Sequence, residues 1–377
     1  MSGYRIMNNK KFEVYFDCGT SKIRAGAFNK IKPKSFFCVE SKFFSNHDIL
    51  DSEIQQIVSN LEEKTKEYLD DVNLMIDSPE MLSIGISISK KLDESKLNKD
   101  DIKFLIQDAK QQVLRNHSKQ VVTHIIIKNY KIDNIDYSFL PEEINCKLIS
   151  LDILFICLPK LIVEYFKKQF FKLNISINQI FCSSYVKSIN YKDNLSSIEN
   201  IFFIDMGFNK TSITCFSTNE IIFLNVLPIG GNHITKDISK VLRVDLQKAE
   251  EFKKLFDKNE SLLNEQNFSS ELLQQIMFAR VEEILELSIK SIKLNLGLKT
   301  VNHYKMVLMG EGSRILDNRF KEKITFSNDI DLLEETTEDI FQSALKINRG
   351  ANKQEVVTIP KKQIKQGFFE KLFHFFK

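Results

Sequence analysis

Residues Lys11–Phe28, KFEVYFDCGTSKIRAGAF, contain two alternating runs of apolar and polar side chains around a short polar segment. Such alternation is typical of half-buried strands, and a small-residue segment between two strands predicts a β-hairpin. A glycine lets the backbone approach a ligand, and adjacent N–H groups, hydroxyls and an ammonium hold phosphate oxygens. An ordinary polar turn has a similar composition. The candidate phosphate-binding residues are Asp17, Gly19, Thr20, Ser21 and Lys22.

A second hairpin of the same kind is predicted half a chain later, at Ile201–Phe216, IFFIDMGFNKTSITCF. Its apolar strand also ends on Asp-x-Gly. The turn residues are Asp205, Gly207, Asn209 and Thr211. Two such hairpins indicate an internally duplicated fold, with the phosphate chain of a nucleotide between its halves. Asp17 and Asp205 are then the candidates to hold Mg²⁺ through water molecules.

The composition limits the classes of protein to consider. Lys and Arg number 53 against 50 Asp and Glu, so the chain lacks a strong positive field, and we expect no nucleic acid partner. The six cysteines show no C-x-x-C spacing and the N-terminus has no apolar leader, so we expect reduced thiols in a cytosolic protein. No stretch approaches the ~20 apolar residues of a transmembrane helix.

The pattern of elements divides the chain into two lobes with an insertion. Residues 85–159 differ from their surroundings, because a helix at Asp101–Asn116 precedes several strand-like runs, which predicts a small inserted α+β subdomain. We expect a first lobe at 1–84 and 160–199, rejoined at about 340–350, a second lobe at 200–231 and 303–339, a small subdomain at 232–302, a linker at 351–366 and a terminal helix at 367–377.

Two further glycine turns follow strands in the second half of the chain. Gly230-Gly231-Asn232 precedes a helix, and a helix N-terminus offers N–H groups to an anion. Gly310-Glu311-Gly312-Ser313 follows the strand-like run Lys305–Met309 and suits a loop against an adenosine. Both turns are therefore candidates for the rest of a nucleotide site.

These motifs together resemble known families. The two hairpins resemble the phosphate loops of the actin, hexokinase and chaperone ATPase superfamily. The run GGNHITKDI at 230–238, with Ala249-Glu250-x-Phe252-Lys253 and VLMGEGS at 307–313, resembles the bacterial cell-division protein family FtsA. The resemblance implies an α/β, actin-like duplicated two-lobe fold with an inserted α+β subdomain of the 1C type and a C-terminal amphipathic helix.

The resemblance also implies a function and a set of partners. Such a protein binds ATP with Mg²⁺, polymerises into protofilaments, tethers FtsZ filaments to the membrane and recruits later division proteins. Its place is the cytoplasmic side of the bacterial inner membrane, at the division site. By matched position, Arg280 would meet the C-terminal peptide of FtsZ. Besides the hairpins, the nucleotide site would include Gly230, Gly231, Asn232, Glu250, Lys253, Gly310, Glu311, Gly312 and Ser313.

The chain departs from the FtsA pattern at two places. Phe208 and Asn209 stand where the family has a richer glycine turn, and Phe181–Ser184 lacks its usual Ala-Gly pair. The bulk of Phe208 hinders the approach of the backbone to a γ-phosphate. We therefore expect ATP binding with at most slow hydrolysis, in a protein that acts mainly as a scaffold.

The C-terminal residues 367–377, GFFEKLFHFFK, segregate their side chains as a helix would. At about 100° per residue the apolar side chains fall within an arc of about 160°, with the charged ones opposite. The segment is too short to span a bilayer, so it predicts an interfacial helix on an anionic lipid surface, or a helix docked on the protein itself. The candidate membrane-binding residues are Phe368, Phe369, Lys371, Leu372, Phe373, Phe375 and Phe376.

Two other functions fit an actin-like fold: a small-molecule kinase, and a pilus-assembly homologue that binds a partner peptide. A kinase should lack both the inserted subdomain and the tail. The pilus homologue shares the insertion but should lack the basic aromatic tail. Both features favour the division protein.

Overall fold

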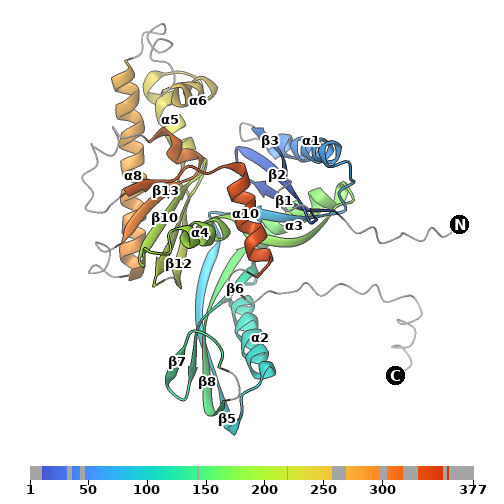
Figure 1. Cartoon of the computed structure of the whole chain (residues 1–377). Coiled ribbons are helices and arrows are strands. Elements are labelled where there is room, and N and C mark those ends of the chain that lie inside the picture. Colours follow the sequence, from blue (N-terminus) through green and yellow to red (C-terminus); the bar gives the residue numbers. More distant parts are fainter. Residues whose placement is uncertain are drawn as a thin grey trace, which may run out of the picture.

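The computed structural model describes residues 11–31, 36–42, 47–141, 144–218, 220–256, 269–296, 304–316, 330–350 and 355. In this part of the chain the strands form two five-stranded sheets and one four-stranded sheet, with helices packed against them (Figure 1). The expected terminal helix, 367–377, and nearly all of the expected linker lie outside the described residues. No helix among the described residues is long and apolar enough to cross a membrane.

The first sheet is built around the N-terminal hairpin. Its strands, in the order β3-β2-β1-β4-β9, are β1 (Phe12–Cys18), β2 (Lys22–Asn29), β3 (Phe36–Lys42), β4 (Asp71–Ile76) and β9 (Ser176–Cys182). β1 and β2 pair antiparallel, as the hairpin predicts, whereas β4 and β9 run parallel to β1. β4 was not predicted, although its apolar run before Asp77 is typical of a buried strand.

The second sheet repeats the first strand for strand. Its strands, in the order β12-β11-β10-β13-β14, are β10 (Ile201–Met206), β11 (Thr211–Ser217), β12 (Glu220–Leu227), β13 (Lys305–Met309) and β14 (Ile330–Leu332). In both sheets an antiparallel meander of three strands is extended by two strands parallel to the first. The duplication that the two hairpins predict therefore extends to whole sheets.

The third sheet has its own hydrophobic core. Its strands, in the order β5-β8-β6-β7, are β5 (Leu82–Lys96), β6 (Gln120–Ile132), β7 (Ile135–Tyr137) and β8 (Asn145–Pro159). Helix α2 (Lys99–Asn116) packs against this sheet, and its start is fixed by a capping box between Asn98 and Asp101. Apolar residues from α2 and the four strands form a core separate from those of the other sheets.

The remaining helices cover the two five-stranded sheets. They are α1 (His47–Thr65), α3 (Lys160–Lys172), α4 (Ser183–Asn194), α5 (Gly231–Leu242), α6 (Leu246–Leu255), α8 (Ser270–Leu296), the short 3₁₀ helix η2 (Glu311–Ile315) and α10 (Thr337–Asn348). α4 and α10 lie between the two sheets (Figure 1). Their buried side chains, Tyr185 and Phe341 among them, join one core with residues of both sheets.

The chain returns to the third sheet after α10. Glu355 forms an isolated antiparallel bridge with Ile126 of β6. Its carboxylate lies 2.6 Å from Nδ1 of His124 and accepts a hydrogen bond from Tyr185 at 3.2 Å. The backbone N–H of Cys182 donates to Nε2 of the same histidine, so Nδ1 carries the proton and donates it to Glu355.

Candidate functional site

Both five-stranded sheets carry their polar residues at one edge, where their parallel strands end. In the first sheet Asp17 lies near the end of β1, Asp77 directly follows β4 and Ser183 directly follows β9. In the second sheet Asp205 lies near the end of β10 and Gly310 directly follows β13. Ligands of open α/β sheets bind outside the carboxyl ends of the strands, so this edge is the expected place for a site.

The two hairpin turns have the same geometry. The N–H of Gly19 donates to the carbonyl of Lys22, and the N–H of Gly207 donates to the carbonyl of Lys210, both at 2.9 Å. A Cβ at Gly19 would lie 2.9 Å from that carbonyl oxygen, and one at Gly207 would lie 3.1 Å from its own. Glycine is therefore needed to close each turn. The equivalence extends from the predicted Asp-x-Gly to the lysine three residues later.

A cleft of about 1150 Å³ is lined by residues of the first sheet and by the turn after β10, α5, α6, η2 and the segment before α10. Its size slightly exceeds the roughly 300–1,000 Å³ that is usual for small-molecule sites. The predicted residues that line it are Ser21, Lys22, Gly231, Glu250, Lys253, Glu311 and Gly312. The lining residues that were not among the predicted site residues are Glu40, Phe208, Gln247, Glu251, Lys254, Phe256, Arg314, Ile315, Glu334, Glu335, Thr336 and Thr337. The segment before α10 was missed because only the fold brings it to the cleft.

The other predicted residues do not line the cleft. They are Asp17, Gly19, Thr20, Asp205, Gly207, Asn209, Thr211, Gly230, Asn232, Gly310 and Ser313. Several of their side chains are engaged within the protein: the hydroxyl of Thr211 donates to the carbonyl of Ile229 at 2.7 Å, and that of Ser313 donates to the carbonyl of Gly310 at 2.8 Å. These residues shape the turns around the cleft.

The start of α5 holds the second turn in place. The N–H of Gly231 donates to the carbonyl of Gly207 at 2.9 Å, and the N–H of Asn232 donates to the carbonyl of Phe208 at 2.7 Å. The next N–H, of His233, donates to Gly230. The expectation of an anion-binding helix start is therefore wrong in this structure, because the carbonyls of the second turn and of Gly230 already use these donors.

Glu250 and Lys253 form a closed pair on the floor of the cleft. Their charged atoms are 2.5 Å apart, and the ammonium also donates to the hydroxyl of Thr235 at 2.7 Å and to the carbonyl of Gly231 at 3.0 Å. Burial raises the pKa of Glu250, but the ammonium of Lys253 outweighs this and lowers it below its ordinary value. Burial lowers the pKa of Lys253 as well, although Glu250 opposes this. The hydrogen bonds of the pair fix α6 to α5.

Two lysines of the turns form ion pairs with the opposite lobe. Nζ of Lys22 lies 2.8 Å from Glu311, which follows β13 of the second sheet. Nζ of Lys210 lies 2.8 Å from Asp77, which follows β4 of the first sheet. Burial acts to raise the pKa of Glu311, but its hydrogen bond from Lys22 and the nearby charge lower it. A phosphate in the cleft would have to compete with these carboxylates for the two ammonium groups.

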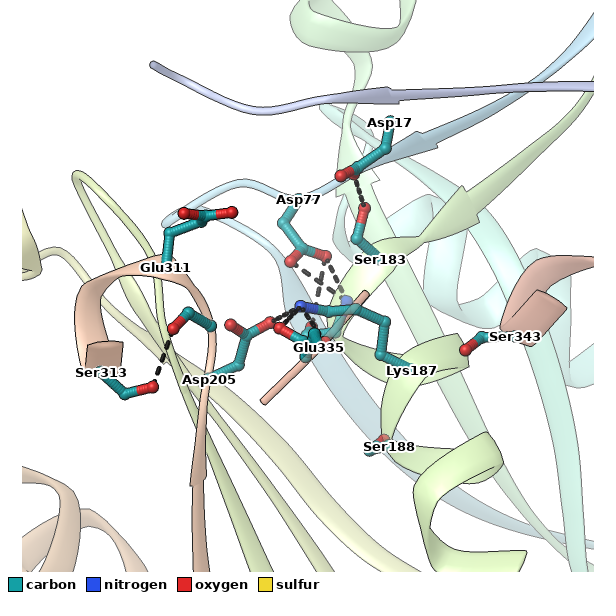
Figure 2. A network of polar contacts seen from close by, with 12 residues as sticks. Asp17, Asp77, Ser183, Lys187, Ser188, Asp205, Glu311, Ser313, Glu335 and Ser343 are labelled. Carbon is teal, nitrogen blue, oxygen red and sulfur yellow. Dashed lines mark hydrogen bonds and ion pairs between the residues drawn. The ribbon is translucent and has the colours of Figure 1, made fainter. Parts of the chain in front are cut away.

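Asp17 is bound by a guanidinium and a hydroxyl. Its Oδ2 lies 2.6 Å from Nη2 and 3.2 Å from Nε of Arg24, which is its cross-strand partner, and its Oδ1 accepts from Ser183 at 3.1 Å. Burial acts to raise the pKa of Asp17, but Arg24 and Lys187 outweigh it, so the pKa lies below its ordinary value. Figure 2 shows the carboxylate directed towards Ser183.

Asp205 is bound by a buried lysine that was not predicted. Nζ of Lys187, on α4, lies 2.5 Å from Oδ2 of Asp205 and 3.2 Å from Glu335, the residue before the N-cap of α10 (Figure 2). Burial would lower the pKa of this lysine, but the two carboxylates raise it above its ordinary value. Tyr191, one turn further along α4, donates to Glu335 at 3.1 Å.

The contacts of the two aspartates do not fit their expected role, which was to hold Mg²⁺ through water molecules. Each carboxylate is already paired with an internal cation, Arg24 or Lys187. A Cβ at Gly310 would lie 2.3 Å from Oδ1 of Asp205, so the loop covers the second oxygen of that carboxylate. The described residues contain no group of three or more His, Cys, Asp or Glu that could hold a metal ion.

Arg280, the expected contact for the FtsZ peptide, is part of an internal ion pair. Its Nε and Nη2 lie 2.5 and 2.9 Å from the two carboxylate oxygens of Asp237 on α5, and its Nη1 contacts Glu283. The guanidinium side chain is 25% exposed. An acidic peptide would therefore have to share or displace this pair.

The comparisons with known proteins give a consistent answer. The sequence model of the family "Cell division protein FtsA" matches residues 202–361. The chain is 23% identical over 98% of its length to the cell division protein FtsA of Buchnera aphidicola, and the alignment covers 97% of that relative. It is also 25% identical to FtsA of Bacillus subtilis, over 50% of this chain and 46% of that relative.

The fold agrees with these matches. A solved chain of the PilM-PilN type IV pilus biogenesis complex superposes with a TM-score of 0.58, covering 88% of this chain and 94% of that chain at 12% identity. This similarity confirms the predicted actin-like fold but carries nothing about partners. The family model that matches residues 202–361 and the relative that aligns along nearly its whole length make the chain similar to cell division protein FtsA, and its duplicated fold is actin-like.

Proposed function

We propose that the chain is a peripheral scaffold of cell division that binds ATP, polymerises, tethers FtsZ filaments to the inner membrane and recruits later division proteins. The observation that carries the nucleotide role is the cleft between the duplicated turns, with Lys22 on one wall and Lys253 at its floor. The phosphates would lie against the first turn and the nucleoside against η2 and α6. Hydrolysis would be slow, because Phe208 occupies the wall of the cleft where the backbone would need to approach a γ-phosphate.

The nucleotide role is tested by titrating a fluorescent ATP analogue into wild type and Lys22→Ala. A charge-assisted hydrogen bond contributes about 1.5–3 kcal/mol, so the variant should bind about tenfold more weakly or worse. Lys103→Ala is the control, because Lys103 pairs with an acid at the exposed surface of α2, the helix that packs on the third sheet. Equal affinity of wild type and Lys22→Ala would remove the nucleotide from this cleft.

The membrane role rests on the sequence of residues 367–377. Truncation after Lys365 should abolish flotation with anionic vesicles while ATP binding persists, and Phe373→Glu should act nearly as strongly because it places a charge within the apolar arc. High salt should weaken wild-type binding without abolishing it. A truncated protein that still floats with vesicles would show that the tail is not the anchor.

The FtsZ role requires a test that separates Arg280 from its internal partner. Arg280→Glu should weaken binding of a C-terminal FtsZ peptide at least about tenfold, because a charged contact is lost and a repulsion gained. Asp237→Asn breaks the same internal pair but leaves the guanidinium available, so peptide affinity should hold or rise. If both variants weaken binding equally, the pair acts only by joining α5 to α8.

The self-association role is assigned in part to the third sheet. A head-to-tail contact that does not close into a ring produces a filament. Ile135 in β7 is 58% exposed, and Ile135→Asp should abolish protofilaments on lipid in electron micrographs. Ile31→Asp is the control, because Ile31 is also exposed but lies just after β2 of the first sheet. Filaments that persist in Ile135→Asp and in a variant lacking residues 85–159 would place the contact elsewhere.

A further inference from the structure

We infer that the ammonium of Lys187, and not a divalent metal ion, is the cation that Asp205 of the second lobe and Glu335 hold. The inference deepens the proposed nucleotide site and rests on it for the nucleotide part of its test. It concerns the two residues, Asp17 and Asp205, through which a metal would be expected to bind.

The lysine is built into the junction of three elements. It projects from α4, which follows the last strand of the first sheet, and reaches Asp205 of the second sheet at 2.5 Å. Glu335, 3.2 Å away, comes from the segment that leads into α10. The residue is only 6% exposed, so its charge is shielded from water and depends on these carboxylates.

Three of the four oxygens of the aspartate pair already bind another side chain, and the fourth lies close to the backbone. Oδ2 of Asp205 holds the ammonium and its Oδ1 lies against the backbone at Gly310. Both oxygens of Asp17 are also taken, by Arg24 and Ser183. Mg²⁺ keeps most of its water and demands nearly octahedral geometry, which a filled contact of this kind cannot provide.

The charges lead to the same conclusion. The ammonium of Lys187 pairs with Asp205 and its charge lowers the pKa of Asp17. Arg24 adds a second positive charge beside Asp17. A divalent ion placed here would be repelled by both cations. Any metal ion that accompanies the nucleotide must therefore bind through the phosphates, without direct help from the two aspartates.

Removing the ammonium of Lys187 should allow a metal ion to bind at Asp205 and Glu335. Without Lys187, Asp205 and Glu335 would face each other as buried like charges, and this would favour either a proton or a metal ion. Lys187→Met keeps an unbranched side chain that is one atom shorter, and removes the charged ammonium with its hydrogen bonds. The variant should therefore create the metal site that the wild-type chain lacks.

The first measurement uses Mn²⁺ alone, by electron paramagnetic resonance on the full-length protein without nucleotide. Wild type should show no bound Mn²⁺ up to about 1 mM, whereas Lys187→Met should bind it and gain thermal stability from it. Lys103→Met, at an exposed lysine of α2, is the control and should behave as wild type. Mn²⁺ bound by wild type and released on Asp205→Asn substitution would overturn the inference.

The second measurement is a cycle of ADP affinities with Mg²⁺ and with EDTA. The ratio of the ADP affinity with Mg²⁺ to the ADP affinity with EDTA should be the same within about threefold in wild type and Asp205→Asn, because the carboxylate does not hold the ion. In Lys187→Met, Mg²⁺ should raise the ADP affinity about tenfold or more above its effect in wild type. This gain should be lost in the double variant that also carries Asp205→Asn. A Mg²⁺ effect that disappears in Asp205→Asn alone would contradict the inference. If no variant binds ADP under either condition, the proposed nucleotide site fails, while the Mn²⁺ result still decides the identity of the cation.

Discussion

Gly230 joins α5 to the second turn, and its replacement by alanine should damage both. A Cβ at this position would lie 2.5 Å from the carbonyl oxygen of Gly207, 2.8 Å from that of Phe208 and 2.8 Å from the nitrogen of Lys210. Real Cβ contacts are essentially never below 3.0 Å, and all three neighbours are backbone atoms that cannot rotate away. The turn and the helix would have to separate.

The cost of this separation can be estimated from the contacts that it breaks. Forcing a methyl group into a packed site costs about 1–3 kcal/mol. The two hydrogen bonds from Gly231 and Asn232 to the turn would also lengthen, at about 1 kcal/mol each. We expect a loss of about 3–5 kcal/mol in the free energy of unfolding, which corresponds to a fall in Tm of about 6–10 °C at roughly 2 °C per kcal/mol.

The assay is thermal and urea unfolding of Gly230→Ala beside Gly85→Ala. Gly85 is the matched control, because a Cβ there would meet nothing within 4 Å. Its variant should lie within about 0.5 kcal/mol of wild type. If Gly230→Ala has the same Tm as wild type and Gly85→Ala, α5 does not hold the second turn in place in solution. ATP affinity should fall together with stability, since the displaced turn forms a wall of the cleft.

Three further outcomes are expected. Glu311→Gln should raise ATP affinity about twofold to fivefold, because it frees Lys22 from a competing carboxylate; a lower affinity in a titration would show instead that Glu311 contacts the nucleotide. Asp17→Asn should lower the free energy of unfolding by about 3 kcal/mol at neutral pH, since it leaves Arg24 without its buried partner. The pKa of Asp17 lies below its ordinary value of 3.8, so its contribution to the free energy of unfolding is present above pH 3.8 and is lost on further acidification. In urea titrations below that pH, wild type and Asp17→Asn should therefore converge in stability. A constant difference between them at all pH values would contradict this reasoning. Glu355→Ala should cost about 1–3 kcal/mol by leaving the buried His124 donor unpaired, whereas the exposed Glu94→Ala should cost nothing measurable in the same urea series.

The parts of the site that could be predicted are the turns whose conformation is set by a few neighbouring residues. Asp-x-Gly between two alternating runs specifies a tight turn by itself, so both hairpins and the duplicated fold could be read from short stretches. Gly310-Glu311-Gly312 after an apolar run was found in the same way. These motifs lie at the cleft because strand ends of both sheets meet there, and strand ends can be located from the sequence.

The ion pairs of Lys187 with Asp205 and Glu335 could not be predicted, because these residues meet only in the folded chain. Lys187 lies in SSYVKSINYK, a segment whose pattern gives no sign that most of α4 is buried between two sheets. A lysine in such a helix is ordinarily solvated. Glu335 is 148 residues away in the sequence, and its partner is set by where α10 packs. The N–H groups of α5 were misjudged for the same reason, since their acceptors belong to a distant turn.

The point at which the chain leaves the folded part limits how the protein could sit on a surface. Glu355 holds the chain against β6 of the third sheet. Roughly a dozen residues separate it from the aromatic segment, and a chain of that length spans at most about 40 Å. If that segment attaches to lipid, the third sheet must stay close to the bilayer. Because Glu355 also accepts a hydrogen bond from Tyr185 of α4, a movement of α4 relative to the third sheet would reach the bilayer through this one residue.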